Sequence, residues 1–201
     1  MNIGVLGGTF DPVHNGHLLV VEEVRVWLNL AGIIFVPAGQ PCLKAEGPFA
    51  SVEHRAEMVR LAIDGRHHYE LSTMEVERPG PSYMVDTIAE VQDRLAAGDE
   101  LFLILGWDNL AELPQWHEPS QLITMCNLVA VSRPGYARPN LKKLEAQIPG
   151  LSQRVEMMDR VKIDISASAI RDRVARGLSI RHLVPDRVNE YIKQNRLYLR
   201  E

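Results

Sequence analysis

The sequence has little cysteine, no excess of basic charge and no long hydrophobic run. Two widely separated cysteines, Cys42 and Cys126, exclude a disulfide framework and a cysteine-based metal cluster. A net charge of −4 gives no reason to expect nucleic acid or an anionic membrane as a partner. Apolar stretches such as 101–105 are far too short to span a bilayer, and the first residues lack the basic segment of a signal peptide. We therefore expect a cytoplasmic protein.

The composition is that of an ordinary globular protein. The chain has 201 residues, of which 46% are hydrophobic and 24% charged. Short apolar runs predict buried strands at 3–6, 32–37, 101–106 and 127–133. Helical patterns separate these runs, which favours a Rossmann-like α/β fold, an open parallel sheet with helices on both faces. We expect a single domain over residues 1–201, with a small C-terminal helical part at about 165–201.

Weaker patterns predict the remaining elements. Further strands are expected at 69–76 and, as two short runs, within 155–165. Helices are expected at 16–30, from Ser51 to Ile63, from Ser82 to Ala97, at 109–113, from Ser166 or Ser168 to Gly177, and from Pro185 to Asn195.

The segment GGTFDPVHNGH follows the first predicted strand. Ligands of open parallel sheets bind beyond the carboxyl ends of the strands, and glycines let a ligand approach the backbone. The next helix would direct free N–H groups to the same place, which favours phosphate. His14 and His17 share a helix face, so both imidazoles can reach one phosphate group. The alternatives are a zinc pair, for which no third ligand is apparent, or a structural capping role.

Three other segments carry candidate binding residues. In 165–171, Ser166, Ser168 and Arg171 can form an anion site, although a plain helix cap explains them equally. In 106–116, Asp108 can accept a hydrogen bond from ribose or help hold a metal, and Trp116 can stack on a flat ring. The alternatives there are a capping aspartate and a core tryptophan. The turn at 79–87 leads into a helix whose amides can receive an anion, and Lys44 can reach a triphosphate or simply be solvated.

Together these segments resemble the bacterial nicotinate mononucleotide adenylyltransferases, of the nucleotidyltransferase superfamily with the HxGH motif. The resemblance runs in order along most of the chain. It rests on GGTFDPVHNGHL (7–18), FVPAGQPCLK (35–44), EHR (53–55), RPGPSYMVDT (78–87), GWDNLAELPQW (106–116), VSRPGY (131–136), ISASAIR (165–171) and LVPDRVNEYIKQNRLY (183–198).

The resemblance implies adenylyl transfer from ATP to nicotinate mononucleotide, which gives nicotinate adenine dinucleotide and pyrophosphate in NAD synthesis. It implies direct in-line attack with Mg²⁺ held through the ATP phosphates, no protein metal site, and possibly a homo-oligomer. His14 and His17 are the catalytic residues that it implies. ATP would contact Gly8, Thr9, Phe10, His14, His17, Lys44, Asp108, Ser166, Ser168 and Arg171. Nicotinate mononucleotide would contact Gly8, Thr9, Tyr83, Met84 and Trp116.

The chain departs from the family pattern at two places. It has PCLK at 41–44 where relatives often have PPHK, and Met84 where they usually have threonine. Backbone recognition of the nicotinate carboxylate would tolerate Met84, whereas recognition through a hydroxyl would not. The alternatives are an adenylyltransferase that prefers nicotinamide mononucleotide or phosphopantetheine, and a catalytically silent nucleotide sensor on the same fold.

Overall fold

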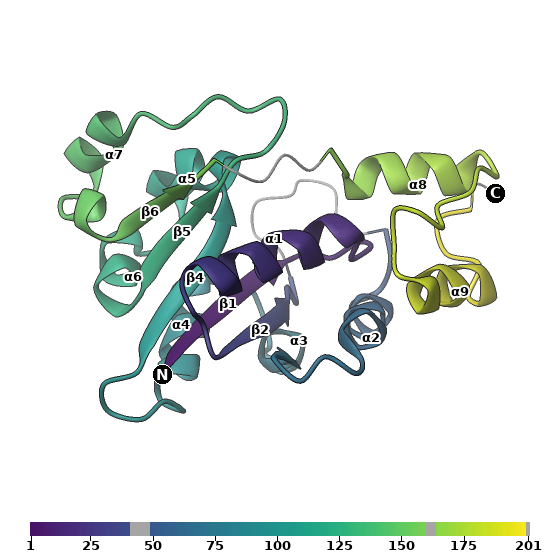
Figure 1. Cartoon of the computed structure of the whole chain (residues 1–201), viewed down its shortest axis with the longest axis horizontal. Coiled ribbons are helices and arrows are strands. Elements are labelled where there is room, and N and C mark those ends of the chain that lie inside the picture. Colours follow the sequence, from purple (N-terminus) through teal and green to yellow (C-terminus); the bar gives the residue numbers. More distant parts are fainter. Residues whose placement is uncertain (41–48, 160–163, 200–201) are drawn as a thin grey trace.

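Figure 1 shows a computed structural model of the chain, in which residues 1–40, 49–159 and 164–199 are described. Within these residues six parallel strands form one sheet in the order β3-β2-β1-β4-β5-β6. The predicted Rossmann-like sheet is confirmed. The strands are β1 (Asn2–Gly8), β2 (Gly32–Pro37), β3 (Tyr69–Leu71), β4 (Glu100–Gly106), β5 (Asn127–Val131) and β6 (Val155–Met158).

Helices cover both faces of this sheet. They are α1 (Asn15–Trp27), α2 (Val52–Ile63), α3 (Met74–Glu77), α4 (Met84–Gln92), α5 (Trp107–Glu112), α6 (Pro119–Met125), α7 (Leu141–Gln147), α8 (Ala167–Ala175) and α9 (Asp186–Gln194). Two single turns of 3₁₀ helix span Leu113–Gln115 and Leu151–Gln153. Among the described residues, no helix has both the length and the apolar character needed to cross a membrane.

The strands divide their side chains between two hydrophobic cores. In β4, Phe102 and Ile104 join a core that includes side chains of α1, α2, α8 and α9. The alternate residues Leu101, Leu103 and Leu105 join a second core with α4, α5, α6 and α7. This period of two is the geometry of a strand buried on both faces, and it explains the uninterrupted apolar run LFLIL.

The C-terminal helices pack on the first face of the sheet rather than apart from it. Ile170 of α8 and Val188 and Ile192 of α9 belong to the same core as α1 and α2. In Figure 1, α8 and α9 lie at one end of the molecule, and α9 lies beside α2. The Asn15 N–H, at the start of α1, donates to the Leu183 carbonyl. The C-terminal segment is therefore fixed to the start of α1.

Three predicted elements are wrong in part. The strand expected at 69–76 ends at Leu71, because the neighbouring β2 ends at Pro37, which has no N–H to extend the ladder; Met74 instead enters the second core in α3. The helix expected from Ser82 to Ala97 spans Met84–Gln92, so Ser82 does not cap it. Of the run expected at 161–165, residues 164–165 are not strand, and the rest lies outside the described residues.

Two helices were missed, and the other boundaries are close. The polar sequences of α6 and α7 carry weak periodicity, although Asn140 caps α7 by accepting from the Lys143 N–H. The helix expected at 109–113 begins earlier, at Trp107. Ser51 and Ser166 cap α2 and α8 as predicted, accepting from the N–H groups of His54 and Ala169 respectively.

Candidate active site

The strand order reverses between β1 and β4, and a cavity of about 540 Å³ opens at the carboxyl ends of these strands. This is the switch point at which open α/β sheets bind ligands. The loop after β1, the first turn of α1, the starts of α4 and α5, the end of β5 and the start of α8 line it. The geometry brings together segments that are far apart in the sequence.

Most of the predicted site residues meet in this cavity. Its walls include Gly8, Thr9, Phe10, His14, His17, Tyr83, Met84, Asp108, Trp116 and Arg171. Ala167 also lines the cavity, whereas Ser166 and Ser168 do not. Their hydroxyls lie 3.2 Å apart at the start of α8, where Ser166 is the helix cap. Lys44 lies outside the described residues.

His14 and His17 stack on each other in the first turn of α1. Their ring centroids are 3.7 Å apart, with an interplanar angle of 21°. The His14 N–H donates to Nδ1 of His17 at 3.2 Å, and the edge of Phe10 supports the His17 ring. Because Nδ1 of His17 is an acceptor, the neutral ring carries its proton on Nε2 and can donate from that atom.

Both imidazoles are neutral at physiological pH. Burial, and secondly the positive charge of Arg133, lower the pKa of His14 from 6.5 to about 4. Burial, with smaller effects from His14 and Arg133, holds the pKa of His17 well below its usual value. The pair is therefore a set of preorganised neutral donors. Phosphate would raise both pKa values, since an adjacent negative charge favours the imidazolium.

Asp108 stands in the first turn of α5, directly beyond β4. Oδ2 accepts from Arg133 at 2.9 Å, whereas the buried Oδ1 has no hydrogen-bond partner among the described residues. A β-carbon on Gly106, which is the helix cap, would lie 2.2 Å from Oδ1. Glycine at 106 thus lets the carboxylate fold back over the strand end. The alternative of Asp108 as the helix cap is wrong.

Trp116 and Met84 form a less polar wall of the cavity. Trp116 packs against the second core with one part of its ring system, and its buried Nε1 has no partner among the described residues. It is half-buried and lines the cavity, so it is not purely a core residue. Met84 reaches over β1, because a β-carbon on Gly7 would lie 2.4 Å from the Met84 methyl group. Nearby, Tyr83 stacks on His117 with ring centroids 4.2 Å apart.

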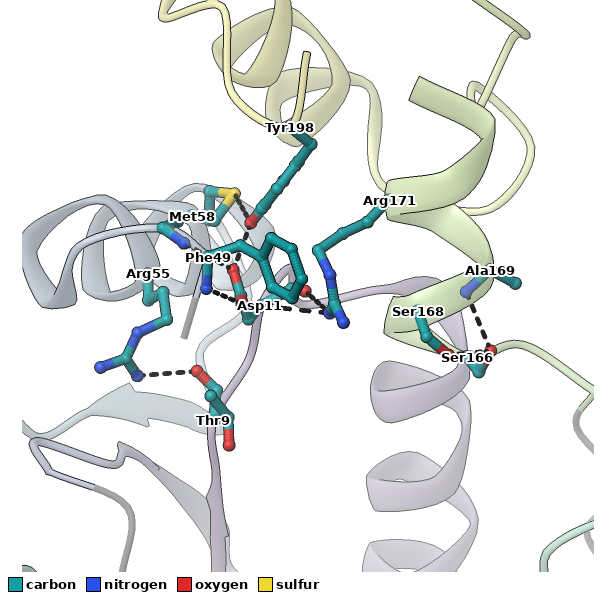
Figure 2. A network of polar contacts seen from close by, with 11 residues as sticks. Thr9, Asp11, Phe49, Arg55, Met58, Ser166, Ser168, Ala169, Arg171 and Tyr198 are labelled. Carbon is teal, nitrogen blue, oxygen red and sulfur yellow. Dashed lines mark hydrogen bonds and ion pairs between the residues drawn. The ribbon is translucent and has the colours of Figure 1, made fainter. Parts of the chain in front are cut away.

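A polar network fixes the loop after β1 (Figure 2). The buried Arg55 donates to the carbonyls of Thr9 and Gly39, at 2.8 and 3.2 Å. Arg171 donates to the Asp11 carbonyl at 2.7 Å. The loop is therefore tied to both α2 and α8, which holds the cavity wall in one conformation.

Sequence reasoning missed the individual roles of Arg133, His117 and Asp11. Arg133 follows β5, which pairs with β4, so the rule that ligands bind at strand ends could have found it. His117 adjoins Trp116, but its stacking on Tyr83 carries no sequence signal. Asp11 lies within the first motif, and its partners come from segments whose folding the sequence does not reveal.

The described residues contain no group of three or more His, Cys, Asp or Glu side chains that could hold a metal ion. The unpartnered Asp108 Oδ1 is an oxygen of the kind that Mg²⁺ prefers, and a single carboxylate suits a cation that arrives on phosphates. The residues therefore fit a metal bound mainly by substrate rather than a resident one.

The comparisons with known proteins agree with this geometry. The fold and the cavity define a nucleotidyltransferase, and the cytidylyltransferase-like family model matches residues 5–173. Two solved chains share the fold. One is the Plasmodium falciparum nicotinic acid mononucleotide adenylyltransferase complexed with NaAD (18% identity, TM-score 0.74, 98% of this chain and 97% of that chain). The other is a Vibrio parahaemolyticus protein titled as a nicotinate-nucleotide adenylyltransferase (15% identity, TM-score 0.68, covering 96% and 98%).

Sequence relatives narrow the class. A Dehalococcoides mccartyi protein named "Probable nicotinate-nucleotide adenylyltransferase" is 44% identical over 201 residues, covering 100% of this chain and 98% of the relative. Proteins with the same name from a Roseiflexus species and from Bacillus licheniformis are 44% and 39% identical over 196 residues, covering 98% of this chain and 97% of each relative. The chain belongs to the nicotinate-nucleotide adenylyltransferase family.

Proposed function

We infer that this chain transfers the adenylyl group of ATP to nicotinate mononucleotide and releases pyrophosphate. The observation that carries this function is the meeting of the stacked His14–His17 pair, Asp108, Arg171 and Trp116 around one cavity. Relatives that cover the whole chain support the particular substrates.

The reaction needs positioning and charge stabilisation rather than a protein nucleophile. A phosphate oxygen of the mononucleotide attacks the α-phosphorus of ATP. The bond from the α-phosphorus to the bridging oxygen breaks, and pyrophosphate leaves with that oxygen. The cavity joins all the lining segments in one space, which allows the two nucleotides to meet at the loop after β1.

His17 donates from Nε2 to an oxygen of the α-phosphate, where negative charge develops in the transition state. Its orientation is fixed in advance by the His14 N–H and by the ring of His14. His14, also neutral before ATP binds, acts on an adjacent phosphate. A rigid donor of this kind needs no reorganisation at the moment of reaction.

Positive charge for the leaving pyrophosphate comes from Arg171, together with Ser166 and Ser168 at the start of α8. We assign Lys44 the same role from its motif. The amides of Gly8 and Phe10, with Thr9, line the junction of the two substrates. Asp108 accepts from the ATP ribose through Oδ1 or shares the Mg²⁺, and Arg133 fixes its position.

The mononucleotide binds at the other end of the cavity. Its pyridine ring stacks on Trp116. The first N–H groups of α4, which have no partner within the helix, receive the nicotinate carboxylate near Tyr83 and Met84. The Met84 side chain lies against Gly7, so recognition of the acid depends on backbone rather than on a hydroxyl.

Mg²⁺ supplies charge neutralisation on the triphosphate when ATP is bound, with Asp108 as the protein group able to approach it. We propose that the enzyme acts in the cytoplasm on these small molecules. The lack of nucleic-acid and membrane partners, assembly into a homo-oligomer and the single-domain organisation stay predictions from the sequence.

The test is Mg²⁺-dependent pyrophosphate release from ATP, with nicotinate mononucleotide, nicotinamide mononucleotide and phosphopantetheine assayed separately. We expect release mainly with the nicotinate substrate. Equal release with the amide would contradict backbone recognition of the carboxylate at α4. Release with phosphopantetheine alone would contradict the assigned substrate, and ATP binding without release would indicate a silent sensor.

A further inference from the structure

The most deeply tied group outside the proposed reaction is the carboxylate of Asp11. The side chain is 3% exposed and accepts four printed contacts from three distant segments. Oδ2 accepts from the Phe49 N–H at 2.8 Å and lies 3.9 Å from a nitrogen of Arg171. Oδ1 accepts from the Ala50 N–H at 3.2 Å and from the Tyr198 hydroxyl at 2.8 Å.

Tyr198 reaches this carboxylate from the C-terminal tail, beyond α9. Its backbone has a φ of +63°, a conformation that aromatic residues rarely adopt without compensating contacts. Burial, and next the charge of Asp11, raise the pKa of the hydroxyl, so it stays protonated and donates. Figure 2 shows the side chain directed from the tail to Asp11. A neutral donor satisfies the carboxylate without neutralising it.

Arg171 stands next to the same carboxylate without forming a close ion pair. Its closest nitrogen donates to the Asp11 carbonyl at 2.7 Å, and its guanidinium lies 4.3 Å from the ring centre of Phe49. The residue lines the cavity. A buried carboxylate deprived of a donor attracts the nearest cation, and Arg171 needs to move only slightly to close the remaining gap.

We propose that Tyr198 is a positioning residue for ATP binding: by satisfying Asp11, its hydroxyl keeps the Arg171 guanidinium directed to the cavity and available to the phosphates of ATP. This inference rests on the proposed function, because it deepens the role of Arg171 there. It adds a residue from the last turn of the chain to the apparatus that sets ATP affinity, although Tyr198 does not line the cavity.

The test compares the full-length protein with Tyr198→Phe, which removes only the hydroxyl. We expect the Kd for Mg-ATP, measured by calorimetry, and the KM for ATP to rise by roughly tenfold, the effect of one charge-assisted hydrogen bond. The KM for nicotinate mononucleotide should stay within about twofold. Calorimetric stoichiometry counts the folded sites, so a partly unfolded sample still reports its affinity.

Tyr191→Phe is the matched control. Tyr191 contacts His54 from α9 at 2.8 Å, so this variant removes a hydroxyl from the same C-terminal region without touching Asp11. We expect its ATP Kd to equal that of the natural protein. In an Arg171→Ala background, Tyr198→Phe should change the ATP Kd less than twofold, because its effect passes through Arg171.

Unchanged ATP affinity in Tyr198→Phe, or an equal loss in Tyr191→Phe, would overturn the proposal. A full effect in the Arg171→Ala background would do so too. The proposed function fails separately: natural protein that binds ATP but releases no pyrophosphate with nicotinate mononucleotide contradicts the reaction, and the Kd comparison still decides the role of Tyr198.

Discussion

Replacement of Trp116 by alanine should separate the two ends of the cavity. Trp116 offers an indole that is anchored on the second core and open to the cavity, with Nε1 buried. Stacking of a nucleotide ring on an aromatic side chain contributes about 1–3 kcal/mol by alanine substitution. The KM for nicotinate mononucleotide should therefore rise about 5- to 150-fold, while the KM for ATP stays within about twofold.

Trp116→Phe is the control, because phenylalanine keeps a ring face but loses the indole N–H. We expect its mononucleotide KM to stay within roughly fivefold of the natural value, since aromatic contacts of different geometry differ by about 1 kcal/mol. Initial rates of pyrophosphate release at varied concentrations of each substrate give both constants. Thermal unfolding of each variant shows whether the loss of core contact has lowered the folded fraction.

A direct signal is also available, since the chain has only three tryptophans. Nicotinate mononucleotide should quench the fluorescence of the natural protein and have little effect on Trp116→Phe. Equal rises of both KM values in Trp116→Ala, or full quenching in Trp116→Phe, would refute the stacking argument. Trp116 would then be a core residue that happens to border the cavity.

Three further predictions follow from the same site. His17→Ala should lower kcat by about 10²–10³-fold, the effect of one lost transition-state donor, with an unchanged unfolding midpoint; near-normal pyrophosphate release would contradict its role. Because the folded-state pKa of His14 is about 4, the unfolded chain binds the extra proton as pH falls from 6.5 towards 4, and about 3 kcal/mol of stability is lost across that window. Urea unfolding of His14→Gln should show a shallower loss, and identical slopes would show that His14 does not cause it. Gly106→Ala should displace Asp108, raise the KM for ATP severalfold and leave the mononucleotide KM unchanged; an unaltered ATP KM would mean that Oδ1 does not contact the nucleotide.

The local sequence predicts most of the fold because strands buried on both faces leave continuous apolar runs. Residues 32–37 and 101–106 are strands for that reason, and Ser51 and Ser166 cap helices because their hydroxyls can reach the first N–H groups. The run at 69–76 was misjudged, because its end depends on Pro37, which belongs to a different strand. Local patterns do not contain that pairing.

The candidate site divides in the same way. His14, His17 and Trp116 lie in motifs that predict their place in the cavity, although their roles stay predictions. The lowered pKa of His14 depends on burial and on Arg133, so the expectation of donors strengthened by protonation does not hold at neutral pH. The Asp11 network needs partners up to 187 residues away, and no spacing within the motif indicates them.

That long-range contact has a consequence during synthesis. A ribosome makes the phosphate loop first and Tyr198 almost last, and the last residues leave the exit tunnel only after termination. Asp11 therefore lacks its tyrosine partner throughout translation, and a nascent chain has the sheet but not the completed ATP site. Prematurely terminated chains that lack the tail are then weak competitors for cellular ATP, so the position of Tyr198 makes full nucleotide affinity a property of finished molecules.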